Sequence, residues 1–100
     1  MPILVRYRPT GMTRAQYDEA SERVQSGLEW PPEGLILHVC FGSDGDMRVS
    51  EVWDSREQLE AYQEGLMPVL QQSGIRFESG EPEYFDVHAI LSREVSTTQA

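Results

Sequence analysis

The sequence predicts one α+β domain in which four strands and two helices follow one another in the order β-α-β-β-α-β. The chain has 100 residues, which is the usual length of a single domain. Four segments carry apolar residues at strand spacing, and two longer segments carry them at helical spacing. Each helical segment begins with a hydroxyl side chain that is suited to cap it. We expect the domain to occupy residues 1–91, with a polar tail over residues 92–100.

The first strand is expected over residues 2–8, and the first helix after Thr13. The apolar face of this strand carries Ile3, Val5 and Tyr7. Thr13 is the expected N-cap, because Gln16 follows three residues later and completes a capping box. Gly27 is the expected end of the helix. Its buried face carries Tyr17, Ala20 and Val24.

The next two segments are expected to form a β-hairpin. Residues 35–41 are apolar on both faces, which is typical of a strand that is buried on both sides. Residues 42–45, with the sequence Gly-Ser-Asp-Gly, are expected to make a tight turn. The turn leads into a strand over residues 46–53.

The second helix and the last strand complete the order. Ser55 is the expected N-cap of the helix, with Gln58 as its capping-box partner. Pro68 has no backbone N–H, so we expect a kink there, or a break and a restart near Leu66. Residues 82–91 alternate in polarity again and are expected to form the fourth strand.

This order of elements is the split β-α-β pattern of ferredoxin-like folds, with one antiparallel sheet and both helices on one of its faces. The other face would then be uncovered. Because residues 35–41 are apolar on both sides, the uncovered face would form a large apolar patch. Two sheets packed face to face would bury that patch. We therefore expect a homodimer with the architecture of a dimeric α+β barrel.

The charge of the chain limits its partners. Eight arginines and no lysine stand against 17 acidic residues, which gives a net charge of −9. Nucleic acids and anionic membranes bind proteins through clustered cations, so neither is an expected partner. No apolar run approaches the length of a membrane span, and Cys40 is the one cysteine, so no disulfide can form within the chain. We expect a reduced, cytoplasmic protein.

His38 and His88 are the two side chains that titrate near neutral pH, which makes them candidates for acid–base chemistry. His38 is the better candidate, because it lies among apolar residues in the middle of a strand. In the expected sheet the second and fourth strands are the two edges, about 14 Å apart at three strand spacings. This distance excludes a metal ion shared by the two histidines of one chain, whereas a contact across the dimer stays open. We expect no metal site. A purely structural role for each histidine stays open.

Aromatic side chains gather near the junction of the third strand and the second helix. We expect Trp53, Tyr62 and His38 to bound a cleft for a planar hydrophobic ligand, with Tyr17 and His88 also in its walls. Within this set, His38 and Tyr62 are the candidate catalytic residues. Packing in the hydrophobic core is the alternative for each aromatic side chain.

Charged residues on the strands have more ordinary interpretations. Glu51, a carboxylate within a half-buried strand, is a further candidate for the site, although solvation at the sheet edge is the expected interpretation. Arg6 and Arg48 lie on neighbouring strands and are expected to pair with Glu51 or Asp86, although they could instead hold a substrate carboxylate.

Part of the sequence resembles a known group of proteins. Val52-Trp53-Asp54-Ser55 ends a strand, and Leu59-Glu60-Ala61-Tyr62 follows on a helix. This pattern is similar to that of the dimeric α+β-barrel proteins related to antibiotic-biosynthesis monooxygenases. The resemblance covers residues 2–91. It implies a ferredoxin-like fold, a homodimer, and a cleft between the sheet and the helices.

The resemblance also implies two chemistries. Haem-degrading members use an asparagine on the first strand and a histidine on the second helix, and this chain has neither, so haem degradation is not expected. Cofactor-independent members oxidise aromatic phenols, which requires a group that holds the phenolate and a dry pocket. We therefore expect a monooxygenase that uses no cofactor and acts on a small hydrophobic or aromatic metabolite.

Two other functions stay open at this point. One is a non-catalytic dimeric binding or interaction protein, and the other is an isomerase or cyclase of the same superfamily. A pocket of roughly 300 Å³ or more near Trp53 and Tyr62 would favour the monooxygenase or the isomerase over the binding protein.

Overall fold

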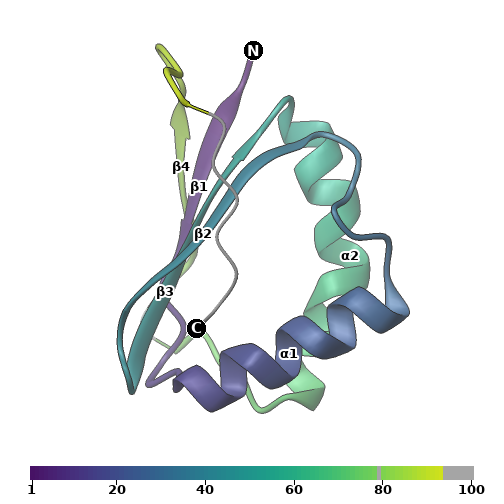
Figure 1. The fold of residues 1–100 in the computed structure, drawn as a ribbon, viewed down its shortest axis with the longest axis vertical. Coiled ribbons are helices and arrows are strands. Elements are labelled where there is room, and N and C mark those ends of the chain that lie inside the picture. Colours follow the sequence, from purple (N-terminus) through teal and green to yellow (C-terminus); the bar gives the residue numbers. More distant parts are fainter. Residues whose placement is uncertain (79, 94–100) are drawn as a thin grey trace.

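The computed structural model describes residues 1–78 and 80–93, and it confirms the expected α+β class. The elements in chain order are β1 (Ile3–Tyr7), α1 (Arg14–Gly27), β2 (Leu35–Ser43), β3 (Asp46–Trp53), α2 (Arg56–Gln72) and β4 (Glu83–Asp86). Figure 1 shows both helices on the same side of one sheet. Residues 94–100 of the expected tail lie outside the described residues.

The sheet is antiparallel with the strand order β2-β3-β1-β4, so β2 and β4 are its edges, as the sequence predicts. Ile3 of β1 lies opposite Trp53 of β3, and His38 of β2 lies opposite Glu51 of β3. Residues that are directly opposite in an antiparallel pair point to the same face of the sheet. The register therefore places the side chains of His38 and Glu51 next to each other.

Both helices begin at the expected caps. The hydroxyl of Thr13 accepts a hydrogen bond from the backbone N–H of Gln16 at 3.1 Å, and the Gln16 side chain accepts one from the backbone N–H of Thr13 at 3.0 Å. These are the two halves of the capping box. The hydroxyl of Ser55 accepts from the backbone N–H of Gln58 at 3.2 Å. Gly74 follows α2 with a φ of +76°, a conformation that glycine adopts without strain.

Pro68 does not interrupt the second helix. Helix α2 runs from Arg56 to Gln72 as one element, so the expected break near Leu66 is wrong. Proline removes one backbone hydrogen bond, but most helical stability in proteins comes from the packing of an apolar face. Leu66 and Leu70, on the two sides of Pro68, both line the space under the sheet and continue that face across it.

The fourth strand is shorter than the sequence predicts. Asp86, the last residue of β4, lies opposite Ile3, and the backbone N–H of Val87 donates to the carbonyl of Pro2 at 3.0 Å. Strand β1 begins at Ile3, so no described strand lies beside residues 88–91. The prediction of a strand over residues 82–91 is therefore wrong after Asp86, because ladder hydrogen bonds need a neighbouring strand.

The hydrophobic core lies between the sheet and the two helices. The largest fully buried side chains are those of Trp53, Leu59 and Val5, which come from β3, α2 and β1. On the opposite face of the sheet, Leu37 and Val39 of β2 are 48% and 41% exposed, and Phe85 of β4 is 46% exposed. No described helix covers this face (Figure 1). We refer to it as the open face.

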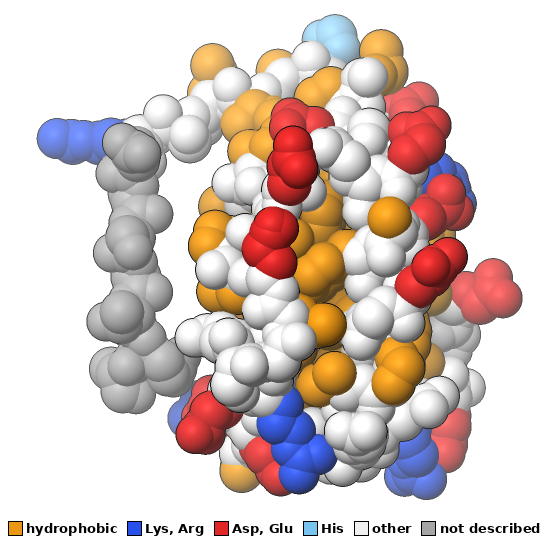
Figure 2. Space-filling view, turned by 90° about the vertical axis from the view of Figure 1, so that its right-hand side faces the viewer, with side chains coloured by type: hydrophobic (Ala, Val, Ile, Leu, Met, Phe, Trp, Pro, Cys, Tyr) orange, Lys and Arg blue, Asp and Glu red, His pale blue; other side chains and the backbone are white. Residues whose placement is uncertain are grey.

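Acidic side chains lie on the outside of the helical layer. Figure 2 views that side of the molecule and shows acidic side chains on both flanks of a hydrophobic middle. Exposed carboxylates on α2 include Glu57, Glu60 and Glu64. In the part of the chain that the structure describes, neither helix is long and apolar enough to cross a membrane.

Candidate functional site

A cavity lies between the sheet and the two helices. Its lining is mostly apolar, with Ala20 and Val24 from α1, and Leu66 and Leu70 from α2. The polar groups of the lining are Tyr7, Tyr17, Ser21, His38, Glu51 and Tyr62. The space inside is about 80 Å³, whereas sites for drug-sized ligands measure roughly 300–1,000 Å³. The size that would by itself favour an enzyme is therefore not reached.

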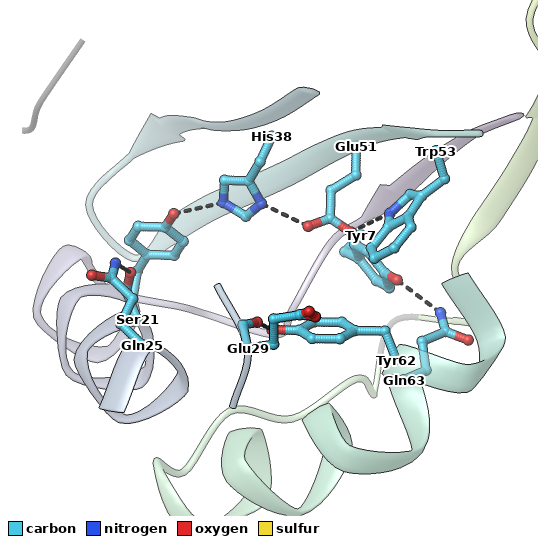
Figure 3. Close-up of polar contacts among 10 residues, drawn as sticks. Tyr7, Ser21, Gln25, Glu29, His38, Glu51, Trp53, Tyr62 and Gln63 are labelled. Carbon is cyan, nitrogen blue, oxygen red and sulfur yellow. Dashed lines mark hydrogen bonds and ion pairs between the residues drawn. The ribbon is translucent and has the colours of Figure 1, made fainter. Parts of the chain in front are cut away.

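His38 is hydrogen-bonded through both nitrogens of its ring. Its Nε2 lies 2.7 Å from the hydroxyl oxygen of Tyr17, and its Nδ1 lies 2.6 Å from Oε2 of Glu51 (Figure 3). The other oxygen of Glu51 accepts a hydrogen bond from the indole N–H of Trp53 at 3.1 Å. We call these four side chains the polar network. It extends from the first turns of α1, across the edge strand β2, to the interior strand β3.

Simple local rules position the polar network. Glu51 and Trp53 are two residues apart on β3, so their side chains point to the same face of the sheet. The β2–β3 register brings His38 to the side of Glu51. The capping box at Thr13 fixes the start of α1, and Tyr17 follows four residues later, with its ring stacked on that of His38 at 6.0 Å between centroids.

The environment of Glu51 differs from the one expected from the sequence. The residue is 5% exposed, so the expectation that it is solvated at a sheet edge is wrong. It shares a face with Val49 and Trp53, and this alternation is the signal in the sequence that could have indicated its burial. A buried carboxylate is tolerated when its oxygens are hydrogen-bonded, and both oxygens of Glu51 are. Arg48 does not pair with it, because its guanidinium contacts Asp46 at 2.9 Å instead.

Trp30 is a part of the site that sequence analysis missed. Its ring meets the ring of His38 edge-on, with centroids 5.4 Å apart, and it lines the cavity from the loop before β2. The loop has neither helical nor strand periodicity, so no pattern in the sequence indicated where this side chain would point.

Tyr62 and Trp53 occupy different positions relative to the cavity. Tyr62 projects from α2 and lies on the far side of the space from His38 and Glu51 (Figure 3). Its hydroxyl donates to the carbonyl of Glu29 at 3.5 Å and is not part of the polar network. Trp53 is fully buried and supports Glu51 from behind the cavity wall. His38, Tyr17 and Tyr62 therefore line the expected cleft, whereas Trp53 does not reach it.

His88 is not brought to this cavity. It is exposed and follows β4, in the segment that has no neighbouring strand, so the expectation that it lines the pocket is not met. Cys40 lies on the same face of β2 as His38, and burial raises the pKa of its thiol. A raised pKa disfavours the reactive thiolate. Within residues 1–78 and 80–93, no three His, Cys, Asp or Glu side chains are grouped so that they could hold a metal ion.

No protein-family model and no curated protein matches the sequence, but several solved structures have a similar fold. The Mycobacterium tuberculosis protein Rv0793 is similar with a TM-score of 0.66 and 16% identity, over 92% of this chain and 100% of that one. SnoaB from Streptomyces nogalater, described as a cofactor-independent oxygenase, is similar with a TM-score of 0.60 and 14% identity, over 92% and 96%. A candidate antibiotic biosynthesis monooxygenase from Chloroflexus aurantiacus is similar with a TM-score of 0.59 and 16% identity, over 91% and 95%.

The fold is that of the antibiotic biosynthesis monooxygenases. The expectation that rested on the Val52-Trp53-Asp54-Ser55 segment is thus confirmed for the fold. At identities this low, fold does not determine activity, so the chemistry of this chain must be argued from its own side chains.

Tyrosine burial in this site makes stability depend on pH. Burial raises the pKa of Tyr17 and that of Tyr62 from 10.0 to about 12, and it also raises the pKa of Tyr7. In the unfolded chain these hydroxyls ionise near pH ~10. The unfolded state therefore loses protons first, so the contribution of these groups to stability is complete below pH ~10 and is lost as the pH rises toward ~12.

Urea unfolding at pH ~9 and ~11 measures this effect, and the chain has no lysine whose titration would overlap. We expect a lower free energy of unfolding at the higher pH. Tyr17→Phe is expected to reduce the difference between the two pH values. A free energy of unfolding that is higher at pH ~11 than at pH ~9 would show that the tyrosines are not held in their neutral form.

Proposed function

We propose that the protein is a cofactor-independent monooxygenase that acts on a small, single-ring phenol of the hydroquinone type. The observation that carries the proposal is the pairing of His38 with buried Glu51 on the wall of an apolar cavity. A histidine held by a carboxylate is a suitable general base near neutral pH. The fold shared with SnoaB, described as a cofactor-independent oxygenase, supports the proposal.

The proposed reaction requires a base and no external reductant. Removal of a phenolic proton gives an electron-rich phenolate, which can donate electrons to dioxygen where a neutral phenol does not. One benzene-1,4-diol and one dioxygen then give one hydroxyquinone and one water. One oxygen atom enters the ring as the new hydroxyl group, and the substrate supplies the two hydrogens and two electrons that reduce the other atom to water. In this scheme, His38 is the base that gains a proton when the phenol ionises, and Glu51 stabilises the resulting imidazolium.

The volume of the cavity limits the substrate to one ring. An engineered cavity that admits benzene measures about 150 Å³, roughly twice the 80 Å³ available here. Even a single ring therefore enters only if a lining side chain turns aside. Trp30 is suited to this movement, because it is half-buried on a loop that belongs to no helix or strand. Fused polycyclic phenols would need a much larger rearrangement.

Labelled oxygen tests the proposed reaction. The protein is incubated under ¹⁸O₂ with a panel of substituted benzene-1,4-diols, and the products are analysed by mass spectrometry against samples without protein. We expect protein-dependent hydroxyquinone that carries one atom of the label. Protein-dependent exchange of a hydrogen on a ring carbon with deuterated water, with no incorporation of label, would instead identify the isomerase-type activity, in which the same base moves a proton without oxygen.

The small cavity favours a second candidate, a non-catalytic dimeric binding or interaction protein. A space of about 80 Å³ is small for an enzyme site, and the polar network would then serve only to fix the packing of α1 on the sheet. This candidate predicts that the diols show neither oxygen incorporation nor hydrogen exchange in the presence of the protein.

The proposed partner of the chain is a second copy of itself, packed sheet to sheet. Exposed apolar side chains on the open face support this arrangement: Leu37, Val39, Phe41 and Phe85. Contiguous apolar surface of this kind is uncommon on monomers and marks interaction sites. Burying this surface against an identical face would remove the second apolar side of β2 from water.

A charge on the open face is expected to separate the two copies. Val39→Glu places a carboxylate in the middle of β2, where it would be buried without a partner in the dimer. Light scattering of the wild type is expected to give about twice the chain mass of 11.4 kDa, and Val39→Glu about that mass. Gln25→Glu, which adds the same charge on the exposed side of α1, is expected to leave the dimer intact. A wild-type mass near 11.4 kDa would contradict the homodimer.

A further inference from the structure

The polar network begins with a hydrogen bond whose direction is fixed. The indole N–H of Trp53 can donate a hydrogen bond but cannot accept one. Oε1 of Glu51, 3.1 Å away, is therefore the acceptor. Because Trp53 is fully buried, water cannot substitute for this contact.

The second oxygen of Glu51 is also a hydrogen-bond acceptor. Oε2 lies 2.6 Å from Nδ1 of His38, and one proton lies between the two atoms. An imidazole is more basic than a carboxylate, so the proton belongs to the nitrogen. Nδ1–H of His38 is then the donor, and both oxygens of Glu51 are acceptors.

A neutral His38 with its proton on Nδ1 has an unprotonated Nε2, which must accept. The group within reach is the hydroxyl of Tyr17, at 2.7 Å. Burial raises the pKa of Tyr17 to about 12, so this hydroxyl keeps its proton and can donate it to Nε2. A phenolic hydroxyl is both a donor and an acceptor, so the oxygen of Tyr17 can still accept a hydrogen bond from the cavity side while its proton is donated to Nε2.

We infer that Tyr17, and not His38, is the group that contacts the ligand, and that the ligand must present an O–H donor to its oxygen. Trp53 is a positioning residue that acts through Glu51 and His38. The inference rests on the proposed function for the step that follows. The ligand O–H bond breaks and its proton forms a bond with the oxygen of Tyr17, while the proton of Tyr17 moves to Nε2 of His38. The products of the step are a ligand oxyanion and an imidazolium beside Glu51.

The tautomer of His38 reports the direction of the hydrogen bonds in the polar network, and it can be measured without an activity assay. Nitrogen NMR of the ¹⁵N-labelled protein at pH ~8, where an ordinary imidazole is neutral, distinguishes the two forms. We expect the proton on Nδ1 of His38. The spectrum of His88→Ala, which lacks the other histidine, assigns the signals. A wild-type spectrum with the proton on Nε2 overturns the inference.

Glu51→Gln provides a sharper version of this test. In this variant an amide replaces the carboxylate, and the indole N–H of Trp53 can donate only to the oxygen of that amide. This contact would turn the NH₂ group of the amide toward Nδ1 of His38. Nδ1 must then accept, and we expect the proton to move to Nε2. In the double variant Glu51→Gln with Trp53→Phe, the amide is free to rotate and a mixture of both forms is expected. If the single Glu51→Gln variant keeps its proton on Nδ1, Trp53 does not set the direction.

Binding of simple ligands tests the role of Tyr17. Phenol and its methyl ether, anisole, have similar shapes, but only phenol donates a hydrogen bond. We expect phenol to bind the wild type at least 10-fold more tightly in an NMR titration, and Tyr17→Phe to remove that preference. Equal affinities in the wild type would refute the assignment of Tyr17. None of these measurements requires turnover. A protein that lacks oxygenase activity can therefore be distinguished from one whose polar network has hydrogen bonds in the opposite direction.

Discussion

Replacement of His38 by alanine is expected to lower the rate of hydroquinone oxidation by about 10²–10⁴-fold, the usual contribution of a general base. The reason is that His38 supplies the only imidazole on the cavity wall within the described residues, and no other base contacts Tyr17. Initial rates at several substrate concentrations measure the effect. The loss is expected mainly in kcat, because the apolar walls that bind the ring are unchanged.

His88→Ala is the matched control for this experiment. It removes the other histidine of the chain, which is exposed and lies outside the cavity, so its rate is expected to equal that of the wild type. If the two alanine variants lose activity equally, or if His38→Ala retains wild-type kcat, the base has been assigned to the wrong residue.

Replacement of Trp53 by alanine is expected to destabilise the protein by about 3–5 kcal/mol, the range found for a fully buried tryptophan. Trp53 is 0% exposed, and its ring packs 5.7 Å from the ring of Tyr62. The substitution leaves a cavity in the core and takes the indole donor away from the buried oxygen of Glu51. Urea unfolding followed by circular dichroism measures the change.

Trp30→Ala is the control of the same chemical type. Trp30 is half-buried on a loop and makes no hydrogen bond to the polar network among the described contacts, so the cost is expected to be no more than about 2 kcal/mol. Equal costs for the two tryptophans would mean that Trp53 does not support the core and the network as described.

The fold could be predicted from the sequence because its signals are local and agree with one another. Thr13 and Ser55 each mark the start of a helix, and the Gly-Ser-Asp-Gly turn fixes the hairpin. The two errors in the fold arise where a distant neighbour decides the outcome. Strand β4 stops because β1 begins at Ile3, and α2 continues through Pro68 because its apolar face packs on the same cavity on both sides.

The candidate site could be predicted only in part. His38, Tyr17 and Tyr62 lie on regular elements with clear periodicity, and the structure brings all three to one cavity. The burial of Glu51 is made possible by two hydrogen-bond partners, His38 and Trp53, and the sequence does not show that these contacts form. The position of Trp30 depends on the course of an irregular loop, for which the sequence carries no periodic signal.

Oxygen consumption by the purified protein shows whether His38 acts as the base for oxidation of a single-ring hydroquinone without a cofactor. Uptake is measured with the diol panel, with no cofactor added and with a metal chelator present, and the rate without protein is subtracted. We expect protein-dependent uptake of one dioxygen for each hydroxyquinone formed, unaffected by the chelator and lost in His38→Ala. No uptake above the protein-free rate with any diol, or uptake that the chelator abolishes, would contradict it.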